Sequence, residues 1–209
     1  MTELWLIRHG ESESNAAGLV QGQFDVHLSE RGREQAKRLA RRLALDPPEL
    51  LFSSDLSRAL DTARAIAEAC HLELHPEPRL REIDMGTWVN QRWEDLATLY
   101  PDDHALLNVG DPEFRRGGGE SKVMLQQRMV AIIEEIVAAQ SGKRIAIVAH
   151  GGAIRAYIAC LLGSPLKGIF TRLKMGNTAI SKVHLPPDGG VPTVFSLNDT
   201  AHLEDWAAL

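Results

Sequence analysis

Short apolar runs alternate with longer segments of helical periodicity in the first part of the chain. Residues 4–7 and 50–53 form two apolar runs, and between them apolar residues recur at helical spacing from Ala36 to Ala44. A second helical pattern covers 56–70, and a short alternating run at 72–74 follows it. This order of strand, helix, strand, helix and strand is typical of a parallel sheet covered by helices on both faces. We expect the alternating run near an edge of that sheet.

Residues 79–119 break this alternation. Aromatic residues stand there among prolines, and the segment ends in three consecutive glycines at 117–119. We expect a helical insertion at about 93–100 with a further turn, closed by a flexible glycine hinge. Such a segment could cover a site as a lid or could be a packed connector, and we expect Trp88 and Trp93 to pack inside it or in the core.

The remaining third of the chain returns to regular elements. Ser121 is expected to cap a long helix whose apolar stripe extends from Leu125 to Val137. An apolar run at 145–149 predicts a further buried strand, and a helical pattern follows it. Two last strands, at 179–185 and 193–197, are separated by a Pro-Pro-Asp-Gly-Gly turn, which predicts a hairpin and therefore a mixed sheet.

Length and charge limit the classes of function. The 209 residues suffice for one domain, which we place at 1–209 with a lid-like insertion at about 83–119. The net charge of −5 and the pI of about 5.9 give no reason to expect nucleic acid or an anionic membrane as partner. Apolar runs stay far below the roughly 20 residues of a membrane helix, and the first strand leaves no room for a signal peptide. We therefore expect a soluble, cytoplasmic protein, and homodimer formation is left open.

The two cysteines, Cys70 and Cys160, lie far apart in the sequence, each in an apolar helical pattern. We expect buried free thiols rather than a disulfide.

Two of the apolar runs end in the same way. The first leads into Arg8-His9-Gly10, and the run at 145–149 leads into His150-Gly151-Gly152. Ligands in open α/β sheets collect at the carboxyl ends of the strands. The sequence therefore predicts a site at this edge with two histidines in it.

Arg58, near the start of a helix, and Glu82 complete a constellation suited to a phosphate dianion. Two guanidiniums and a helix N-terminus can bind its oxygens, and a neutral imidazole can attack phosphorus while the other stabilises charge. A carboxyl group can protonate the leaving alcohol and later deprotonate water. Neither a metal nor a cofactor is required if the arginines supply the positive charge.

Each residue also has a plainer interpretation. A histidine at a strand end is most often structural, Arg58 alone could be a solvated helix residue, and Glu82 could form a surface ion pair. His9, His150 and Glu82 could also form a two-histidine, one-carboxylate metal site, although the two arginines would repel a cation. The functional interpretation depends on all of these residues occurring together.

The motifs occur in the order found in a known family. They are Arg8-His9-Gly10-Glu11, Ser53-Ser54-Asp55-Leu56-x-Arg58-Ala59-x-x-Thr62-Ala63, Leu80-x-Glu82-x-x-x-Gly86-x-Trp88, Gly118-Gly119-Glu120-Ser121, Ala149-His150-Gly151-Gly152 and the closing segment 197–203. This ordered set resembles the histidine phosphatase superfamily, in the branch that includes cofactor-dependent phosphoglycerate mutase.

The resemblance implies a three-layer α/β/α sandwich with a mostly parallel mixed sheet and a helical lid insertion. It implies His9 as the phosphorylated nucleophile and Glu82 as proton donor and acceptor. The phosphate pocket would consist of Arg8, Arg58 and His150, with positioning groups at Asn15, Gln21, Gly22 and Gly151. The chain departs from the family at one place. Val89-Asn90 stand where the family commonly has an acidic residue and a glycine, so the resemblance extends to the phosphate pocket but not to the wall that contacts the rest of the substrate.

The length of the insertion favours one member of the family over another. Mutases resemble this chain but carry a longer insertion with more basic residues, whereas here Arg115-Arg116 is the sole basic pair between Glu82 and Gly119. We therefore favour a phosphatase acting on a small phosphorylated metabolite, with a mutase as the alternative. A non-catalytic phospho-ligand module is disfavoured because such a module needs neither His9 nor Glu82. We expect Trp88 and Arg116 to influence the choice of substrate.

Overall fold

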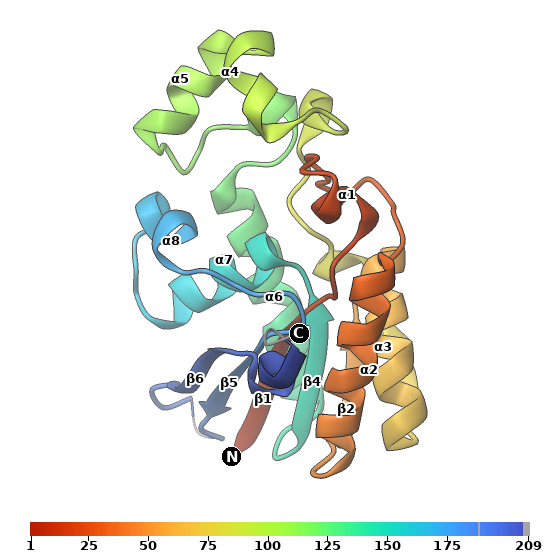
Figure 1. Cartoon of the computed structure of the whole chain (residues 1–209). Helices are drawn as coiled ribbons and strands as arrows, with labels where there is room; N and C mark the ends of the chain where they lie inside the picture. Colours follow the sequence, from red (N-terminus) through yellow and green to blue (C-terminus); the bar gives the residue numbers. More distant parts are fainter. Residues whose placement is uncertain (188, 207–209) are drawn as a thin grey trace.

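The computed structural model describes residues 1–187 and 189–206, which form a six-stranded sheet with helices on both faces (Figure 1). The strand order is β3-β2-β4-β1-β5-β6. The first four of these strands run parallel to one another, while β5 is antiparallel to β1 and β6 is antiparallel to β5. The predicted mixed, mostly parallel α/β sheet and its terminal hairpin are confirmed.

The strands are β1 (Thr2–Arg8), β2 (Leu50–Ser53), β3 (Leu74–Pro76), β4 (Arg144–Ala149), β5 (Ile180–Leu185) and β6 (Thr193–Asp199). The α-helices are α1 (Glu13–Ala16), α2 (Glu30–Ala44), α3 (Ser57–Cys70), α4 (Leu96–Leu99), α5 (Pro101–Val109), α6 (Lys122–Ala139), α7 (Gly151–Leu161) and α8 (Leu166–Arg172). Short 3₁₀ turns cover Pro78–Leu80, Gly86–Trp88, Trp93–Asp95, Arg116–Gly118 and Ala201–Trp206.

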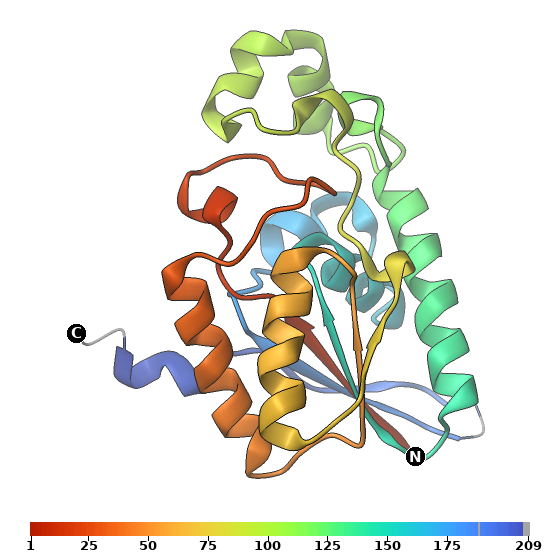
Figure 2. The same ribbon diagram turned by 90° about the vertical axis from the view of Figure 1, so that its right-hand side faces the viewer.

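The central strand β1 is buried on both faces, so its alternating side chains enter two separate cores. Leu4 and Leu6 pack with residues of α6 and α7, while Trp5 and Ile7 pack with residues of α2 and α3. Figure 2 shows α2 and α3 side by side on one face and α6 on the other. A strand of this kind reads as a continuous apolar run, which is why the sequence pattern locates it.

The helix starts follow from capping side chains. Ser29 Oγ accepts a hydrogen bond from the Gly32 N–H at the start of α2, and Ser121 Oγ accepts one from the Met124 N–H at the start of α6. The predicted cap at Ser121 is confirmed.

The insertion after Glu82 stands over the end of the sheet where β1 and β4 finish (Figure 1). The predicted helical turns are present as α4 and α5, and the glycines expected to form a flexible hinge lie against another backbone segment. A Cβ on Gly117 would lie 2.6 Å from the Met85 carbonyl oxygen, and one on Gly119 would lie 2.3 Å from that of Asp84. The glycines therefore allow two backbone segments to pack against each other.

The two tryptophans of the insertion have different environments. Trp88 is fully buried in the core, as expected, so its predicted influence on the choice of substrate can only be indirect. Trp93 is 51% exposed, and it lines the cavity described below rather than packing in the interior.

Three further features differ from expectation. The edge strand β3 begins two residues later than predicted, and α8 was not predicted because its few apolar residues flank a glycine at 168. Both cysteines are free, but Cys70 is only half-buried and Cys160 is exposed on the outer side of α7.

None of the helices formed by residues 1–187 and 189–206 is both long and apolar enough to cross a membrane. The cytoplasmic location, the single-domain boundaries and the oligomeric state stay predictions.

Candidate active site

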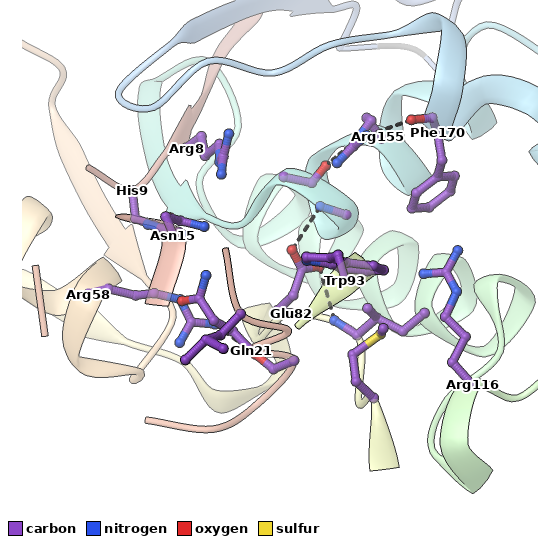
Figure 3. A pocket seen from close by; sticks show the side chains of 16 residues that line it. Arg8, His9, Asn15, Gln21, Arg58, Glu82, Trp93, Arg116, Arg155 and Phe170 are labelled. Atoms are coloured by element: carbon purple, nitrogen blue, oxygen red, sulfur yellow. Dashed lines mark hydrogen bonds between the residues drawn. The ribbon is translucent and has the colours of Figure 1, made fainter. Parts of the chain in front are cut away.

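A cavity of about 210 Å³ lies where β1 and β4 end, and all the predicted site residues except His150 line it (Figure 3). Because β1 and β4 are neighbours and Arg8 pairs with Ala149 in the ladder, the residues that follow the two strands emerge side by side. The predicted juxtaposition of the two His-Gly motifs at one sheet edge is therefore present.

His9 is oriented for attack through one ring nitrogen. Its Nδ1 lies 2.6 Å from its neighbour's carbonyl oxygen, that of Gly10. A carbonyl can only accept a hydrogen bond, so Nδ1 carries the proton and Nε2 holds the lone pair. The neutral ring presents a nucleophile at Nε2.

The surroundings of His9 keep the ring neutral. Only 3% of the residue is exposed, and burial together with the positive charges of Arg58 and Arg8 holds the pKa of His9 well below its usual range. A histidine with its lone pair free near neutral pH is what nucleophilic attack on phosphorus requires.

Two arginines whose guanidinium Nε atoms are buried flank His9. Arg58 donates from Nη1 to the Phe24 carbonyl (2.9 Å) and from Nη2 to the Gly22 carbonyl (2.7 Å). Arg8 donates from Nη1 to the carbonyl of Met175. Within residues 1–187 and 189–206, the Nε atom of each arginine is buried without a hydrogen-bond partner. Burial lowers the pKa of Arg58 to about 10, so the group stays charged at neutral pH.

Such fixed cations with unused donors are suited to an anion that brings several acceptor oxygens. A phosphate dianion can accept hydrogen bonds from both guanidiniums at once. The main chain orients the two groups before a ligand arrives, which lowers the entropic cost of binding.

His150 lies behind His9 rather than in the cavity wall. The two ring centroids are 5.1 Å apart, and His150 Nε2 lies 2.8 Å from the hydroxyl oxygen of Ser54, in the predicted Ser53-Ser54-Asp55 motif. The ring is fully buried, and its Nδ1 has no hydrogen-bond partner among the described residues. Its contact with a transferred phosphate stays a prediction.

Glu82 faces the cavity from the opposite side, and backbone amides hold its carboxylate. Oε2 accepts from the Gly152 N–H (2.9 Å), and Oε1 accepts from the N–H groups of Ala153 and Ile83 (3.0 Å each). Arg128 on α6 donates to the Glu82 carbonyl and thereby fixes the main chain. The alternative of a surface ion pair with Arg81 is wrong, because Arg81 pairs with Asp55.

Gly152 permits this contact, so the Gly152→Ala variant should be impaired. A Cβ there would lie 2.3 Å from Glu82 Oε1, and the carboxylate would have to move. We expect kcat/KM for an alkyl phosphate to fall by about 10²-fold with the thermal melting point little changed, since small misplacements of a catalytic group have effects of that size. In a Glu82→Gln background the same substitution should cost little more, because its effect acts through Glu82. Full activity in the folded single variant would contradict this arrangement.

The predicted positioning residues of the first loop come from one short structure. Ser12 caps α1, and its hydroxyl donates to the side-chain oxygen of Gln21 (2.7 Å). The side chain of Asn15 completes the capping box of the same helix by accepting from the Ser12 N–H. Gly22 has a positive φ of 53°, and a Cβ there would lie 2.9 Å from Met85. Asn15, Gln21 and Gly22 all line the cavity, and their role in positioning a substrate stays a prediction.

Several residues support the site although no role was assigned to them from the sequence. Thr62 Oγ1 accepts from the Gly10 N–H and donates to the Arg58 carbonyl. It therefore links the backbone that follows β1 to the start of α3. Asn177 and the Thr178 backbone both donate to the His9 carbonyl. Arg155 lines the cavity, with its Nε donating to Gly151 O at 2.8 Å. No pattern in the sequence singles out these supporting contacts, because most of them are made to backbone groups.

The alternative of a metal site has no support in the geometry of residues 1–187 and 189–206. No three His, Cys, Asp or Glu side chains there are grouped so that they could hold a metal ion. Whether the reaction is independent of metal stays a prediction.

The arrangement can be compared with known proteins. A profile of the histidine phosphatase superfamily (branch 1) matches residues 4–200. This chain belongs to that superfamily. The chain is 35% identical over 206 residues to "Phosphoserine phosphatase 1" of Hydrogenobacter thermophilus, covering 99% of this chain and 96% of that protein. It is 36% identical over 213 residues to "Probable phosphoglycerate mutase GpmB" of Proteus mirabilis, covering 99% and 97%.

Solved structures of other histidine phosphatases superimpose closely. A phosphoserine phosphatase from Entamoeba histolytica, in complex with 3-phosphoglyceric acid, has a TM-score of 0.87 at 30% identity and covers 97% of this chain and 100% of its own. A mycobacterial glucosyl-3-phosphoglycerate phosphatase complexed with VO3 has a TM-score of 0.85 at 32% identity, covering 94% and 98%. The three-layer fold inferred from the motifs is therefore confirmed.

Proposed function

We propose that this histidine phosphatase hydrolyses small phosphomonoesters through a phosphohistidine formed at His9. One observation supports this most directly. A neutral, buried imidazole with its Nε2 lone pair free stands between two arginines whose buried Nε atoms have no hydrogen-bond partner among the described residues. A non-catalytic binding module would need the arginines but not the nucleophile, nor a carboxylate fixed by amides across the cavity.

In the first step the phosphoryl group passes to the enzyme. Arg8 and Arg58 bind the phosphate oxygens, and His9 Nε2 forms a bond to phosphorus while the bond to the ester oxygen breaks. Glu82, entering this step protonated, gives its proton to the departing oxygen. An alcohol leaves, and the positive charge on the phosphorylated ring is offset by the bound phosphoryl oxygens.

In the second step water replaces the alcohol. Glu82, now ionised, removes a proton from the water as its oxygen bonds to phosphorus and the N–P bond breaks. Inorganic phosphate leaves, His9 recovers its lone pair and Glu82 its proton. The cycle needs no redox partner, and the arginines supply the positive charge at the phosphoryl group.

Hydrolysis is favoured over isomerisation for two reasons. Relatives that cover nearly the whole chain include phosphoserine phosphatases from Hydrogenobacter thermophilus and Arabidopsis thaliana. The insertion between Glu82 and Gly119 is short and folds into small helices beside the cavity. A mutase stays the alternative, because relatives with that name match equally well.

A panel of metabolite phosphates separates the candidates. It should contain phosphoserine, 3-phosphoglycerate with and without a bisphosphoglycerate primer, and p-nitrophenyl phosphate, with free phosphate and isomerised product scored separately. Release of phosphate as the main product supports the proposal. Primer-dependent isomerisation that exceeds hydrolysis would assign the protein as a mutase, and no turnover of any ester would favour the binding module.

Removal of metal ions should leave the activity unchanged. Arg8 and Arg58 neutralise the charge that a divalent ion would otherwise offset, so we expect the same kcat before and after exhaustive chelation. Vanadate should inhibit competitively, because it can adopt the five-coordinate geometry that phosphorus has in the transition state of phosphoryl transfer. Loss of activity on chelation that one particular metal restores would revive the two-histidine, one-carboxylate site.

A further inference from the structure

The loop between α8 and β5 holds the main chain of the nucleophile. The side-chain amide of Asn177 donates to the His9 carbonyl oxygen (3.2 Å), and the Thr178 N–H donates to the same oxygen (3.3 Å). The Met175 carbonyl accepts a hydrogen bond from the Arg8 guanidinium. We call residues 175–178 the support loop. A shift of the support loop would therefore move the nucleophile and a phosphate-binding group together.

The support loop contains a residue with an unfavourable backbone conformation. Thr178 has a φ of 57° and is fully buried. Four non-glycine residues have a positive φ in the part of the chain that the structure describes, and Thr178 is the one whose Cβ is branched. A β-branched residue is a true outlier in this region and stays there only when its surroundings impose it. Contacts from other segments must therefore hold Thr178 in place.

His202, in the 3₁₀ turn after β6, makes such a contact. Its Nδ1 lies 3.3 Å from Nη1 of Arg42, and its Nε2 lies 2.9 Å from the Thr178 hydroxyl oxygen. A guanidinium can only donate, so Nδ1 accepts and Nε2 carries the proton. Thr178 in turn donates to the Asn177 carbonyl (2.7 Å). The three hydrogen bonds run in one direction, from α2 through His202 into the support loop.

The surroundings of His202 fix both its position and its charge state. Arg42 forms a bidentate ion pair with Asp199 at the end of β6, and the turn Ala201–Trp206 lies beside α2 (Figure 2). Burial and the positive charge of Arg42 lower the pKa of His202 to about 4. The ring is therefore neutral near neutral pH, as its hydrogen bond from Arg42 requires.

A second contact from the same segment reaches the support loop. The side-chain oxygen of Asn198 accepts from the Gly176 N–H (2.6 Å), and the Asn198 N–H donates to the Ser181 hydroxyl on β5 (3.1 Å). Asn198 and His202 lie outside the lining of the active-site cavity. They therefore hold the support loop at two points from behind the site.

We propose that His202 and Asn198 are positioning residues for phosphoryl transfer, acting through the support loop on His9 and Arg8. The inference rests on the proposed phosphatase function and adds two residues outside the cavity to those on which the reaction depends. Without His202, Thr178 can relax to a common backbone conformation, and the His9 carbonyl and the Arg8 guanidinium then lose their fixed partners. The two groups would no longer meet a phosphate in the geometry that in-line attack requires.

The first test is the pattern of loss in His202→Ala. We expect kcat/KM to fall by about 10²-fold, since small misplacements of reacting groups have effects of that size. The factor should be the same for phosphoserine and for p-nitrophenyl phosphate, because His9 and Arg8 act on the phosphoryl group whatever the leaving oxygen. A defect transmitted through Glu82 would instead affect phosphoserine more strongly.

Asn198→Gly is a second variant that keeps the test decisive if His202→Ala does not fold. Glycine adopts the positive φ of 57° that Asn198 has, so the substitution removes the acceptor for the Gly176 N–H without straining the main chain. It should reduce kcat/KM for both esters by the same factor.

Two further variants distinguish positioning from a general loss of structure. His202→Gln places an amide nitrogen near the position of Nε2, so it can donate to Thr178 and should retain most of the activity. Thr178→Gly in the His202→Ala background should recover activity by about 10-fold, because glycine adopts a positive φ without steric cost. If His202 only packed the interior, removal of a second buried side chain would lower the activity further.

His184→Ala is the matched control. His184, on β5, is half-buried like His202, but it pairs in the ladder with Glu3, at the end of β1 away from the site. Its replacement should leave both kcat/KM and the affinity for phosphate unchanged. Melting curves check the folding of every variant.

Binding of inorganic phosphate separates failure of this inference from failure of the proposed function, because it needs no turnover. Isothermal titration should show about 10-fold weaker binding to His202→Ala than to wild type, as expected when one charge-assisted hydrogen bond is impaired. If wild type hydrolyses p-nitrophenyl phosphate and the folded variants match it in rate and phosphate affinity, the inference is wrong and the phosphatase stands. A loss in His202→Ala that Thr178→Gly deepens would also overturn the inference. If no ester is hydrolysed, but phosphate binding weakens in His202→Ala and recovers with Thr178→Gly, the positioning role stands without the phosphatase.

Discussion

Replacing His9 by alanine should lower kcat by about 10⁴–10⁶-fold. Removing the nucleophile of an enzyme with a covalent intermediate reduces kcat by factors of this size. Among residues 1–187 and 189–206, the imidazole that lies against His9 is that of His150, which is fully buried and whose Nε2 lies 2.8 Å from the Ser54 hydroxyl, so it is not placed to substitute for His9. Arg8 and Arg58 would still bind phosphate, so KM for p-nitrophenyl phosphate should change far less than kcat.

Rapid-quench labelling measures the intermediate directly. Wild-type protein mixed with a ³²P-labelled ester should give an adduct that acid hydrolyses and base leaves intact, as expected of a phosphohistidine, and His9→Ala should give none. His27→Ala is a suitable control, because that side chain is 71% exposed and pairs with Asp61 on the surface. Wild-type turnover by His9→Ala, or labelling that persists in it, would refute the mechanism.

Much of this fold could be predicted because its signals are local. A strand buried on both faces is a continuous apolar run, as β1 and β4 are. A serine that caps a helix stands directly before an amphipathic pattern, as it does at α2 and α6. α8 lacks both signals, because its few apolar residues surround Gly168 at a positive φ of 86°. It was therefore missed, and with it the position of Phe170.

The inner part of the site could be predicted for a related reason. Arg8, His9 and Gly151 are placed by strand ends, and strands that are neighbours in a sheet bring their ends together. The side of the cavity lined by Arg116, Arg155 and Phe170 could not be predicted. There Arg116, Lys122 and Arg155 lie around the ring of Phe170, and nothing in the spacing of these residues indicates a shared contact. Contacts between elements distant in sequence follow from packing, which a single sequence does not display.

Glu82 should matter in proportion to how much the leaving oxygen needs a proton. The alcohol of a sugar or glycerate phosphate is a poor leaving group as an alkoxide, so Glu82→Gln should slow phosphoryl transfer to His9 from such esters by about 10²–10⁴-fold. A nitrophenolate leaves readily without a proton, so transfer from p-nitrophenyl phosphate should be almost normal. Glutamine has nearly the same shape, and its amide oxygen can still accept hydrogen bonds from the N–H groups of Ala153 and Ile83. Its amide nitrogen then faces the Gly152 N–H, so the variant loses that hydrogen bond together with the proton.

The second step makes the distinction visible in one experiment. Water attacking the phosphohistidine needs Glu82 as base whatever the first substrate was, so the Glu82→Gln variant should accumulate the intermediate. With p-nitrophenyl phosphate, stopped-flow absorbance should therefore show a burst of about one nitrophenol per active site, followed by slow turnover. The burst requires both roles of Glu82, because loss of a merely structural contact would slow transfer from both kinds of ester alike. An equal loss of rate for both kinds of ester, with no burst, would mean that another group performs the proton transfers. Asp84 is poorly placed for them, since its Oδ1 accepts from the Gly86 N–H and the residue does not line the cavity.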